Sequence, residues 1–321
     1  MIRTSIIEHP SDISRVRSMW NELHLDHGGT MFQSYAWNET AARVFGRRER
    51  PYIVVAANDA GSTIIPACVT ERGVSLIGET LFDYRDALGV DGSLIETGLA
   101  KLATLQKDFS VTAVRGQSAA KRWEGLRVEP FAKAPGVWGK DVTLEEFLGS
   151  QRRLGRHSRR IRKQGIDLYE YSGPKRDLAR FIYERKSEQG GGADNLFSDP
   201  LRREFMVEIC SHPESQCEIY TYETASDLVA GLVTFRDGKI RRFYTVYYDQ
   251  RWASLSPGQV LLFEITAKSL GQGLDCDYMT GEYAYKMRLA TDSVPLCRVT
   301  ANHKQLHDLA RRSVPQTRVA A

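Results

Sequence analysis

The chain has 321 residues, of which 26% are charged and 42% are hydrophobic, and its formal net charge is +4. This composition excludes a disordered or low-complexity protein and provides enough apolar material for one large domain or two ordinary ones. The longest apolar runs, such as residues 260–263, are too short to cross a membrane, and residues 1–10 lack a secretory signal. We therefore expect a cytoplasmic protein with no transmembrane segment.

The five cysteines are widely scattered: Cys68, Cys210, Cys217, Cys276 and Cys297. No two of them are at C-x-x-C spacing, which argues against a zinc knuckle or a dithiol redox motif. We expect reduced, mostly buried thiols and no metal cofactor.

The first half of the chain predicts a helix followed by a three-stranded meander. Ser34 is suited to cap a helix that extends to Val44. Turn-forming segments then separate three runs that we predict as strands, at residues 51–56, 62–69 and 74–77. A helix at 96–107 and a strand at 111–114 complete this half.

The second half repeats this order about 166 residues later. Pro200 fits the first position of a helix that extends to Ile209. The elements that follow are strands at 217–222, 228–235 and 240–246, a helix at 258–270 and a strand at 276–279. The near-constant offset predicts two copies of one α/β unit, with two unrelated α/β domains as the alternative. The predicted parts are an N-terminal module at 1–135, a C-terminal module at 136–310 and a flexible tail at 311–321.

A helix N-terminus suited to bind an anion is predicted in the second half. Ser256 fits the N-cap, Pro257 fits the first helical position, and Gly258 allows a ligand to approach the backbone. The N–H groups of residues 258–260 would then point out of the helix, where they bind phosphate without a basic side chain. An ordinary capped helix is the alternative. Residues 86–93 of the first half lack this pattern, so we expect a single anion site.

Charged and aromatic residues follow the last predicted strand of the second half. Gly281 ends the strand, and Glu282, Tyr285 and Lys286 come just after it, at the edge where ligands bind in open α/β sheets. A carboxylate, a phenol and an ammonium group can supply a base, an acid and a fixed positive charge. A surface loop with an aromatic anchor is the alternative.

Taken in order, these segments resemble a known family. The C-terminal signature of the cellulose-biosynthesis (CelD/BcsL-like) acyltransferases is similar to Ser256-Pro-Gly258, Leu261-Leu262, Glu264, Gly273, Asp277, Gly281-Glu282 and Tyr285-Lys286. The N-terminal and middle elements of that family resemble Phe32-Gln-Ser-Tyr-Ala-Trp37, Asp83-Tyr-Arg-Asp86 and the Arg-rich segment at 152–162. This family belongs to the GNAT superfamily and is related to the Fem-type aminoacyltransferases. The resemblance covers roughly residues 30–300.

The resemblance implies an α/β fold of two tandem GNAT-like modules, each a mixed, mainly antiparallel sheet flanked by helices. The first module would be degenerate. The implied reaction transfers an acyl group, acetyl in the simplest case, from acetyl-CoA or another acyl-CoA to an amine. Two features depart from the family. The GNAT pyrophosphate signature has Gln or Arg and then Gly where this chain has Ala253 and Ser256, and the aromatic residue after the Tyr-Lys pair is replaced by Leu289.

With this resemblance, roles can be assigned to individual residues. The residues expected to contact the cofactor are Tyr247, Ser256, Pro257, Gly258, Gln259, Val260 and Leu261. Glu282 is the candidate base and Tyr285 the candidate acid, while Lys286 would orient a carboxylate or phosphate of the acceptor. Backbone N–H groups near residues 244–247 would stabilise the oxyanion. The candidate substrate-binding residues are Asp83, Asp86, Arg156, Arg160, Tyr244 and Asp277.

A strongly basic helix is predicted between the two copies. Thr143 and Glu146 fit a capping box, and Gly165 fits a C-terminal stop. Residues 151–163 contain seven of the 44 Lys and Arg residues and no acid, so the rest of the chain carries 37 basic and 40 acidic residues. Six of these cations, Arg156 and Arg160 among them, fall on one helix face. This face is either a solvated surface or the binding site of the CoA 3′-phosphate, a phosphorylated acceptor, tRNA or a membrane.

Two other functions stay open. A Fem-type transferase would take its aminoacyl group from tRNA, which the basic helix favours, although the sequence lacks the helical-hairpin insertion that this similarity predicts. A non-catalytic GNAT-like binding module would keep the fold and lose the cofactor. In the leading interpretation the acceptor is a small molecule or a sugar or peptide precursor, an anionic one included, and tRNA is a partner only in the alternative.

Overall fold

A computed structural model describes residues 1–26, 29–78, 81–116, 125–189 and 195–313. Contacts within the chain divide it into two compact units, residues 1–132 with 295–321 and residues 133–294. The segment after Val294 thus packs with the first unit, whereas the predicted second module continued to residue 310. The predicted tail begins within helix α11 (His303–Ser313), and from residue 314 it lies outside the described residues.

The first unit is built on strands in the order β1-β2-β3-β4-β5-β12. β4 and β5 pair in parallel, and the other neighbours in this order pair antiparallel. The strands are β1 (Arg3–Ile7), β2 (Arg50–Asn58), β3 (Gly61–Thr70), β4 (Gly73–Leu76), β5 (Phe109–Arg115) and β12 (Asp292–Ala301). Besides α11, the α-helices in the described part of this unit are α1 (Arg17–Asp26), α2 (Tyr35–Phe45) and α3 (Gly92–Lys101).

The second unit repeats this arrangement with strands in the order β7-β8-β9-β10-β11-β6. Here β10 and β11 form the parallel pair, and the other neighbours pair antiparallel. The strands are β6 (Arg127–Val137), β7 (Asp167–Glu170), β8 (Cys217–Glu223), β9 (Leu228–Asp237), β10 (Ile240–Tyr248) and β11 (Asp275–Asp277). The α-helices are α5 (Leu144–Ser150), α6 (Arg152–Lys163), α7 (Lys175–Glu188), α8 (Pro200–Ser211), α9 (Pro257–Gly271) and α10 (Ala284–Met287). The predicted repeat of one mixed, mostly antiparallel α/β unit is therefore confirmed.

The last strand of each unit comes from the other half of the chain. β6 follows β5 in the sequence but pairs with β11, and β12 follows β11 but pairs with β5. The chain therefore passes from one unit to the other twice. The predicted division assumed that each half folds on its own residues, which is why its second boundary differs from the observed one.

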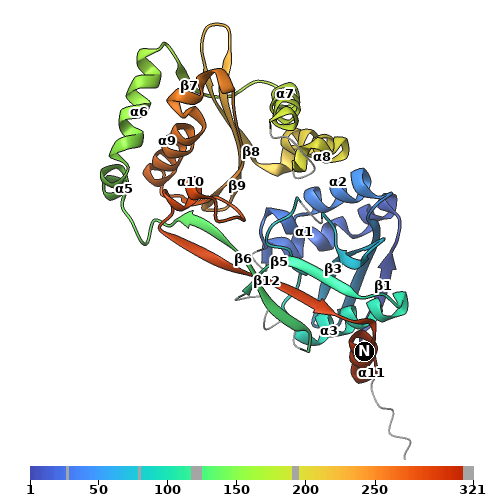
Figure 1. The fold of residues 1–321 in the computed structure, drawn as a ribbon. Helices are drawn as coiled ribbons and strands as arrows, with labels where there is room; N and C mark the ends of the chain where they lie inside the picture. Colours follow the sequence, from blue (N-terminus) through green and yellow to red (C-terminus); the bar gives the residue numbers. More distant parts are fainter. Residues whose placement is uncertain (27–28, 79–80, 117–124, 190–194, 314–321) are drawn as a thin grey trace, which may run out of the picture. The chain divides into compact units, whose positions relative to one another are not determined.

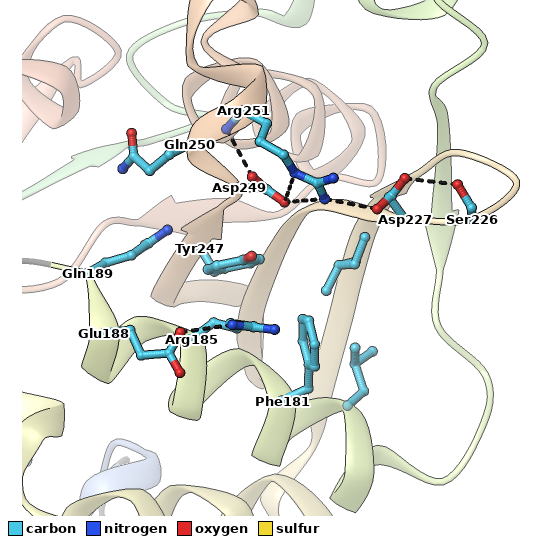
Figure 2. A pocket seen from close by; sticks show the side chains of 12 residues that line it. Phe181, Arg185, Glu188, Gln189, Ser226, Asp227, Tyr247, Asp249, Gln250 and Arg251 are labelled. Atoms are coloured by element: carbon cyan, nitrogen blue, oxygen red, sulfur yellow. Dashed lines mark hydrogen bonds and ion pairs between the residues drawn. The ribbon is translucent and has the colours of Figure 1, made fainter.

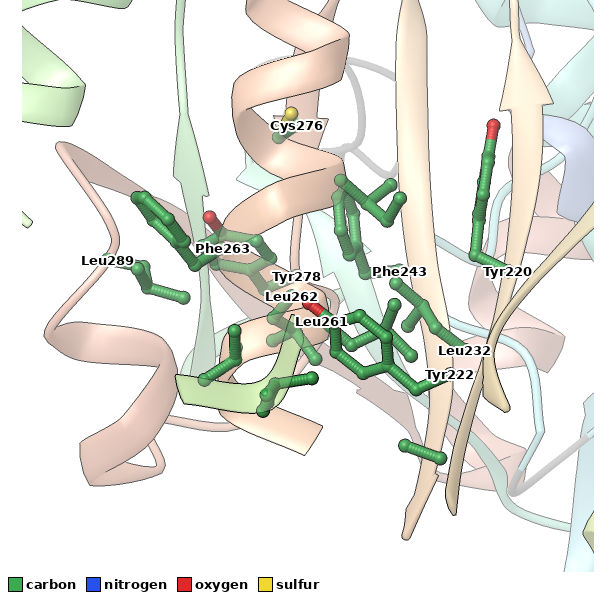
Figure 3. Packing of buried hydrophobic residues seen from close by; sticks show 14 of the residues in the cluster. Tyr220, Tyr222, Leu232, Phe243, Leu261, Leu262, Phe263, Cys276, Tyr278 and Leu289 are labelled. Atoms are coloured by element: carbon green, nitrogen blue, oxygen red, sulfur yellow. The ribbon is translucent and has the colours of Figure 1, made fainter. Parts of the chain in front are cut away.

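Helix α9 is enclosed on both of its sides. Its inner side contacts β8, β9, β10 and β11, its outer side contacts α5 and α6, and α7 and α8 lie on the opposite face of the sheet (Figure 1). Nine of its fifteen residues are buried, which is why this helix is apolar on nearly all sides. Figure 3 shows Leu261, Leu262 and Phe263 of α9 packed with Phe243 and Tyr278 in the core of this unit. This packing fixes the N-terminus of α9 beside the C-terminal end of β10.

Two helices differ from the predicted ones. The basic segment forms two helices instead of one, because the backbone breaks at Gln151 (φ −101°, ψ 30°) between α5 and α6. The capping box of Thr143 and Glu146 is confirmed, as is Gly165, whose φ of +69° ends α6. Helix α3 begins at Gly92, four residues before its predicted start, because Asp91 caps it.

The five cysteines are free, and four of them are buried.

Candidate functional site

The parallel pair of the second unit separates after three residues. Ile240–Arg242 of β10 pair with Asp275–Asp277 of β11, whereas the pairing of β10 with β9 continues to Tyr248. Within the described part of the chain, residues 243–248 of β10 therefore have a strand partner on one side only. Backbone N–H and C=O groups on the other side are not used by the sheet and can bind an extended ligand.

A β-bulge lies where the two strands separate. The register of β10 against β9 shifts between Phe243 and Thr245, so that Tyr244 is the extra residue. Without a bulge residues 243 and 245 would share a face. Instead Phe243 packs beside Tyr278 on the α9 face, and Thr245 accepts a hydrogen bond from the buried Tyr183 hydroxyl of α7 on the other face (3.2 Å). The bulge turns this stretch of backbone away from regular pairing at the position predicted to stabilise an oxyanion.

A buried ion pair holds β10 and β11 together before they separate. The guanidinium of Arg242 binds the carboxylates of Asp277 and Asp237, and both Arg242 and Asp277 are almost fully buried. Asp277 also accepts a hydrogen bond from the backbone N–H of Met279 (2.8 Å). Its carboxylate is thus occupied inside the unit, and the predicted contact of Asp277 with a substrate is not supported by this geometry.

The N-terminus of α9 lies beside the open edge of β10. Ser256 occupies the N-cap in the left-handed region (φ 54°), and its side chain makes no capping hydrogen bond. Its carbonyl accepts from the N–H groups of Gln259 and Val260 (both 3.1 Å), so two of the three N–H groups that were predicted to be free already have a partner. The helix end is thus left without a side-chain cap but offers fewer donors than predicted.

The other predicted cofactor residues divide between two faces of β10. A Cβ on Gly258 would lie 3.2 Å from Tyr248 and 3.3 Å from Val246, so this glycine seats α9 on the strand instead of leaving room for a ligand. Pro257, Val260 and Leu261 are buried, and a ligand could reach only their backbone. The ring of Tyr247 lies on the opposite, α7-facing side, where it packs edge-on against Phe181 (6.2 Å between centroids).

The three predicted catalytic side chains follow β11 but point to different surroundings. The ammonium of Lys286 donates to the carbonyl of Thr280 (2.9 Å) and stabilises the loop, so its predicted contact with an acceptor is not supported. Glu282 is 47% exposed at its side chain and lies 3.7 Å from the ammonium of Lys133. Burial raises the pKa of Tyr285 to about 12, so its phenol stays protonated at neutral pH but is a weaker acid than an ordinary tyrosine.

A cavity of about 760 Å³ lies between α7, the β8–β9 turn and the end of β10 (Figure 2). Its apolar part includes Phe181 and Tyr247, and its charged part is formed by Arg185, Glu188, Asp227, Asp249 and Arg251. The sequence did not reveal this cavity, because its residues come from three segments, and Tyr247 is the one predicted site residue among those that line it.

The charges of this cavity are paired, with one carboxylate in excess. Arg251 binds Asp249 (2.7 Å) and Asp227 (2.8 Å), and these hydrogen bonds lower the pKa of both carboxyl groups. Arg185 binds Glu188 (2.9 Å), which raises the pKa of the guanidinium. Three carboxylates against two guanidiniums give the cavity a net negative charge, which favours a cationic ligand such as a protonated amine.

The remaining predicted residues lie outside this cavity. Arg156 and Arg160 are exposed on α6. Tyr244 is half-buried, with its ring edge-on to Phe235 (5.6 Å). Asp83 and Asp86 belong to the first unit, where Asp86 is 4% exposed and accepts from the N–H of the following residue.

Neither a metal site nor a membrane span was found in the described part of the chain. No three or more His, Cys, Asp or Glu side chains gather there as metal ligands would. Likewise, none of the helices there combines the length and the apolar character that crossing a bilayer requires.

Part of the second unit is similar in sequence to a known family. Residues 149–287 match the family described as Acetyltransferase (GNAT) domain. A search of curated proteins gave no match.

Solved structures resemble the chain over nearly its full length. FemX is 11% identical with a TM-score of 0.61, covering 96% of this chain and 99% of its own. L-PGS from Bacillus licheniformis is 9% identical with a TM-score of 0.60, covering 92% and 95%. A tandem GNAT protein from the clavulanic acid biosynthesis pathway is 9% identical with a TM-score of 0.52, covering 94% and 99%. At these identities the likeness shows the fold alone. Residues 149–287 are thus similar to the GNAT acetyltransferase domain, and the chain has the fold of tandem GNAT-like proteins.

Proposed function

We propose that this protein transfers an acyl group, acetyl in the simplest case, from an acyl-CoA to an amine of a small acceptor. The observation that carries the proposal is the open edge of β10 at residues 243–248, which lies directly beside an uncapped helix N-terminus. An extended pantetheine chain can bind along such an edge through backbone hydrogen bonds, while the helix end attracts a phosphate. The family match of residues 149–287 supports the same assignment.

The residues of the second unit suit the three requirements of direct transfer. The amine nitrogen attacks the thioester carbonyl, the C–N bond forms as the C–S bond breaks, and the leaving thiolate takes a proton. Backbone N–H groups beside the Tyr244 bulge would donate to the carbonyl oxygen, a role that the break in regular pairing there supports. Tyr285, our candidate acid, carries its proton at neutral pH and would donate it to the thiolate. The exposed carboxylate of Glu282 accepts the amine proton through water.

The negatively charged cavity of about 760 Å³ is our candidate acceptor site. Tyr247 lies in this cavity, and the backbone of the same residue belongs to the open edge of β10. An acceptor held against the ring of Tyr247 would therefore lie beside β10, the strand along which we propose that the thioester binds. The surplus carboxylate favours an ammonium group on this acceptor, whether it is a free metabolite or an amino sugar or peptide precursor.

Titration calorimetry on the full chain tests the proposal. We expect acetyl-CoA to bind and aminoacyl-tRNA not to compete with it. A subsequent assay should show CoA release that depends on an added amine. An absence of acetyl-CoA binding would contradict the proposal.

The second candidate is a Fem-type transferase that takes its aminoacyl group from tRNA. The fold likeness to FemX and the seven cations of α6 favour it. Binding of charged tRNA without binding of acetyl-CoA would select this function. Binding of neither ligand would indicate a non-catalytic module.

A further inference from the structure

Helix α6 begins at the C-terminal edge of the parallel pair, held there by two side chains. The amide of Gln151 donates to the carbonyl of Arg288, which follows α10 (3.0 Å). A ring nitrogen of His157 contacts the carbonyl of Leu255, in the 3₁₀ helix η6 (Gln250–Leu255) just before α9 (3.3 Å). The first half of α6 therefore spans the distance between the segments that follow β10 and β11.

The second half of α6 is anchored along α9. Glu264 of α9 accepts hydrogen bonds from Ser158 and from the guanidinium of Arg162 (2.9 Å), and its side chain is only 9% exposed. These contacts, together with those of Gln151 and His157, fix both the position of α6 and its rotation about its own axis.

Six cations of α6 are exposed and lack a carboxylate within ion-pair distance among the described residues: Arg152, Arg153, Arg156, Arg159, Arg160 and Lys163. Arg162 is the exception, through Glu264. Like charges three and four residues apart repel one another and weaken a helix. An anionic ligand that binds these side chains would relieve the repulsion.

The contact of His157 shows which of these cations lie nearest to the start of α9. Arg153 and Arg160 are four residues before and three residues after His157, which places them about 40° and 60° from it around the helix. Arg152 and Arg159 are about 140° and 160° away, on the far side. The helix thus offers two pairs of arginines with equal charge and different distances from the Leu255 segment.

We propose that Arg153 and Arg160 bind phosphate groups at the nucleotide end of CoA, an inference that rests on the proposed function. The start of α9 has few donors for a phosphate, because the N–H groups of Gln259 and Val260 bind Ser256 and residue 257 is a proline. The first position of the GNAT signature, where that family has Gln or Arg, is Ala253 in this chain. Arginines from α6 would supply the missing positive charge, and a guanidinium can bind a phosphate through two parallel hydrogen bonds.

The test compares two double variants of the full chain, Arg153→Gln with Arg160→Gln and, as the matched control, Arg152→Gln with Arg159→Gln. Each removes two exposed charges from the same helix, so both should unfold at the temperature of the wild type. Calorimetry with CoA and with dephospho-CoA, which lacks the 3′-phosphate, measures binding directly. We expect the first pair to weaken CoA binding by at least roughly tenfold and the control pair by less than about twofold.

The outcomes separate the inference from the proposed function. A larger loss for CoA than for dephospho-CoA in the first pair assigns the 3′-phosphate to these arginines, and an equal loss assigns the diphosphate. Equal losses in the two double variants would show a general effect of charge and overturn the inference, as would unchanged affinity in the first pair. Wild-type protein that does not bind CoA at all would overturn both the inference and the proposed function.

Discussion

Helices α3 and α9 occupy equivalent places in the two units but begin differently. At the start of α3 the carboxylate of Asp91 accepts hydrogen bonds from the N–H groups of Ser93 (2.8 Å) and Leu94 (3.4 Å). At the start of α9 the side chain of Ser256 makes no such bond. The N-terminus of α3 therefore already carries its own anion, whereas that of α9 has no anionic cap. This difference favours our proposal that the phosphate binds to the second copy of the repeat.

The strands next to these helices also differ, because the strand edge is covered in the first unit and open in the second. After β4 the backbone of the first unit returns to β5, where the N–H of Arg85 donates to the carbonyl of Ala113 (3.2 Å). Leu88 then forms a bridge with Ile64 of β3. The first unit thus covers with its own chain the region that stays open along residues 243–248 of the second.

The largest expected effect comes from the buried ion pair that precedes the open edge. Asp277→Ala leaves Arg242 buried with a single carboxylate partner and should lower the free energy of unfolding by about 3–5 kcal/mol. Urea denaturation measures this loss. Asp237→Ala removes the more exposed partner of Arg242 and should cost less. A loss below about 1 kcal/mol for Asp277→Ala would mean that the pair does not hold β10 to β11.

The second test uses a glycine in the first turn of each helix, Gly92 in α3 and Gly258 in α9. A methyl group on Gly258 would press on Val246 and Tyr248, so Gly258→Ala should destabilise the protein by about 1–3 kcal/mol. Nothing lies within 4 Å of a Cβ on Gly92, and Gly92→Ala should be neutral or stabilise by up to about 1 kcal/mol. Thermal unfolding of the two variants should give shifts of opposite sign or unequal size. Equal shifts would contradict the close seating of α9 on β10.

The cap of α3 should contribute a smaller amount that depends on pH. Asp91→Ala should cost about 1 kcal/mol at neutral pH, because two N–H groups lose their partner. The hydrogen bond of Ser93 is the main cause that lowers the pKa of Asp91 in the folded protein. The stabilisation is therefore present above the pKa of the unfolded chain, about 3.9, and is lost as the pH falls through the lower folded value. Stability curves of wild type and variant should accordingly converge below about pH 4, and a constant difference down to pH 2 would argue against the cap.

Local sequence patterns predicted most elements of both units but not the partners of their last strands. Turn residues and β-branched runs located the meanders because these features depend on neighbours in the chain. The exchange of β6 and β12 depends on contacts between distant segments, which periodicity does not report. The burial of Asp277 could not be predicted for the same reason, because it depends on an ion pair with Arg242, 35 residues away in the chain. The sequence therefore suggested a contact of Asp277 with substrate instead. The close packing at Gly258 could not be predicted either, because only the fold places Val246 and Tyr248 beneath it.

The most direct test of the account places one negative charge at the start of each equivalent helix. Gln259→Glu in α9 suits the helix dipole and should leave stability unchanged or slightly higher. Ser93→Glu in α3 is the control; it removes the hydrogen bond of the Ser93 hydroxyl to Asp91 (2.7 Å) and should lower stability somewhat without affecting CoA binding. In calorimetric titrations with CoA we expect one binding site per chain, weakened roughly fivefold or more by Gln259→Glu and unchanged by Ser93→Glu. Two sites per chain, or equal affinity in the two variants, would contradict the claim that only the second unit holds the cofactor.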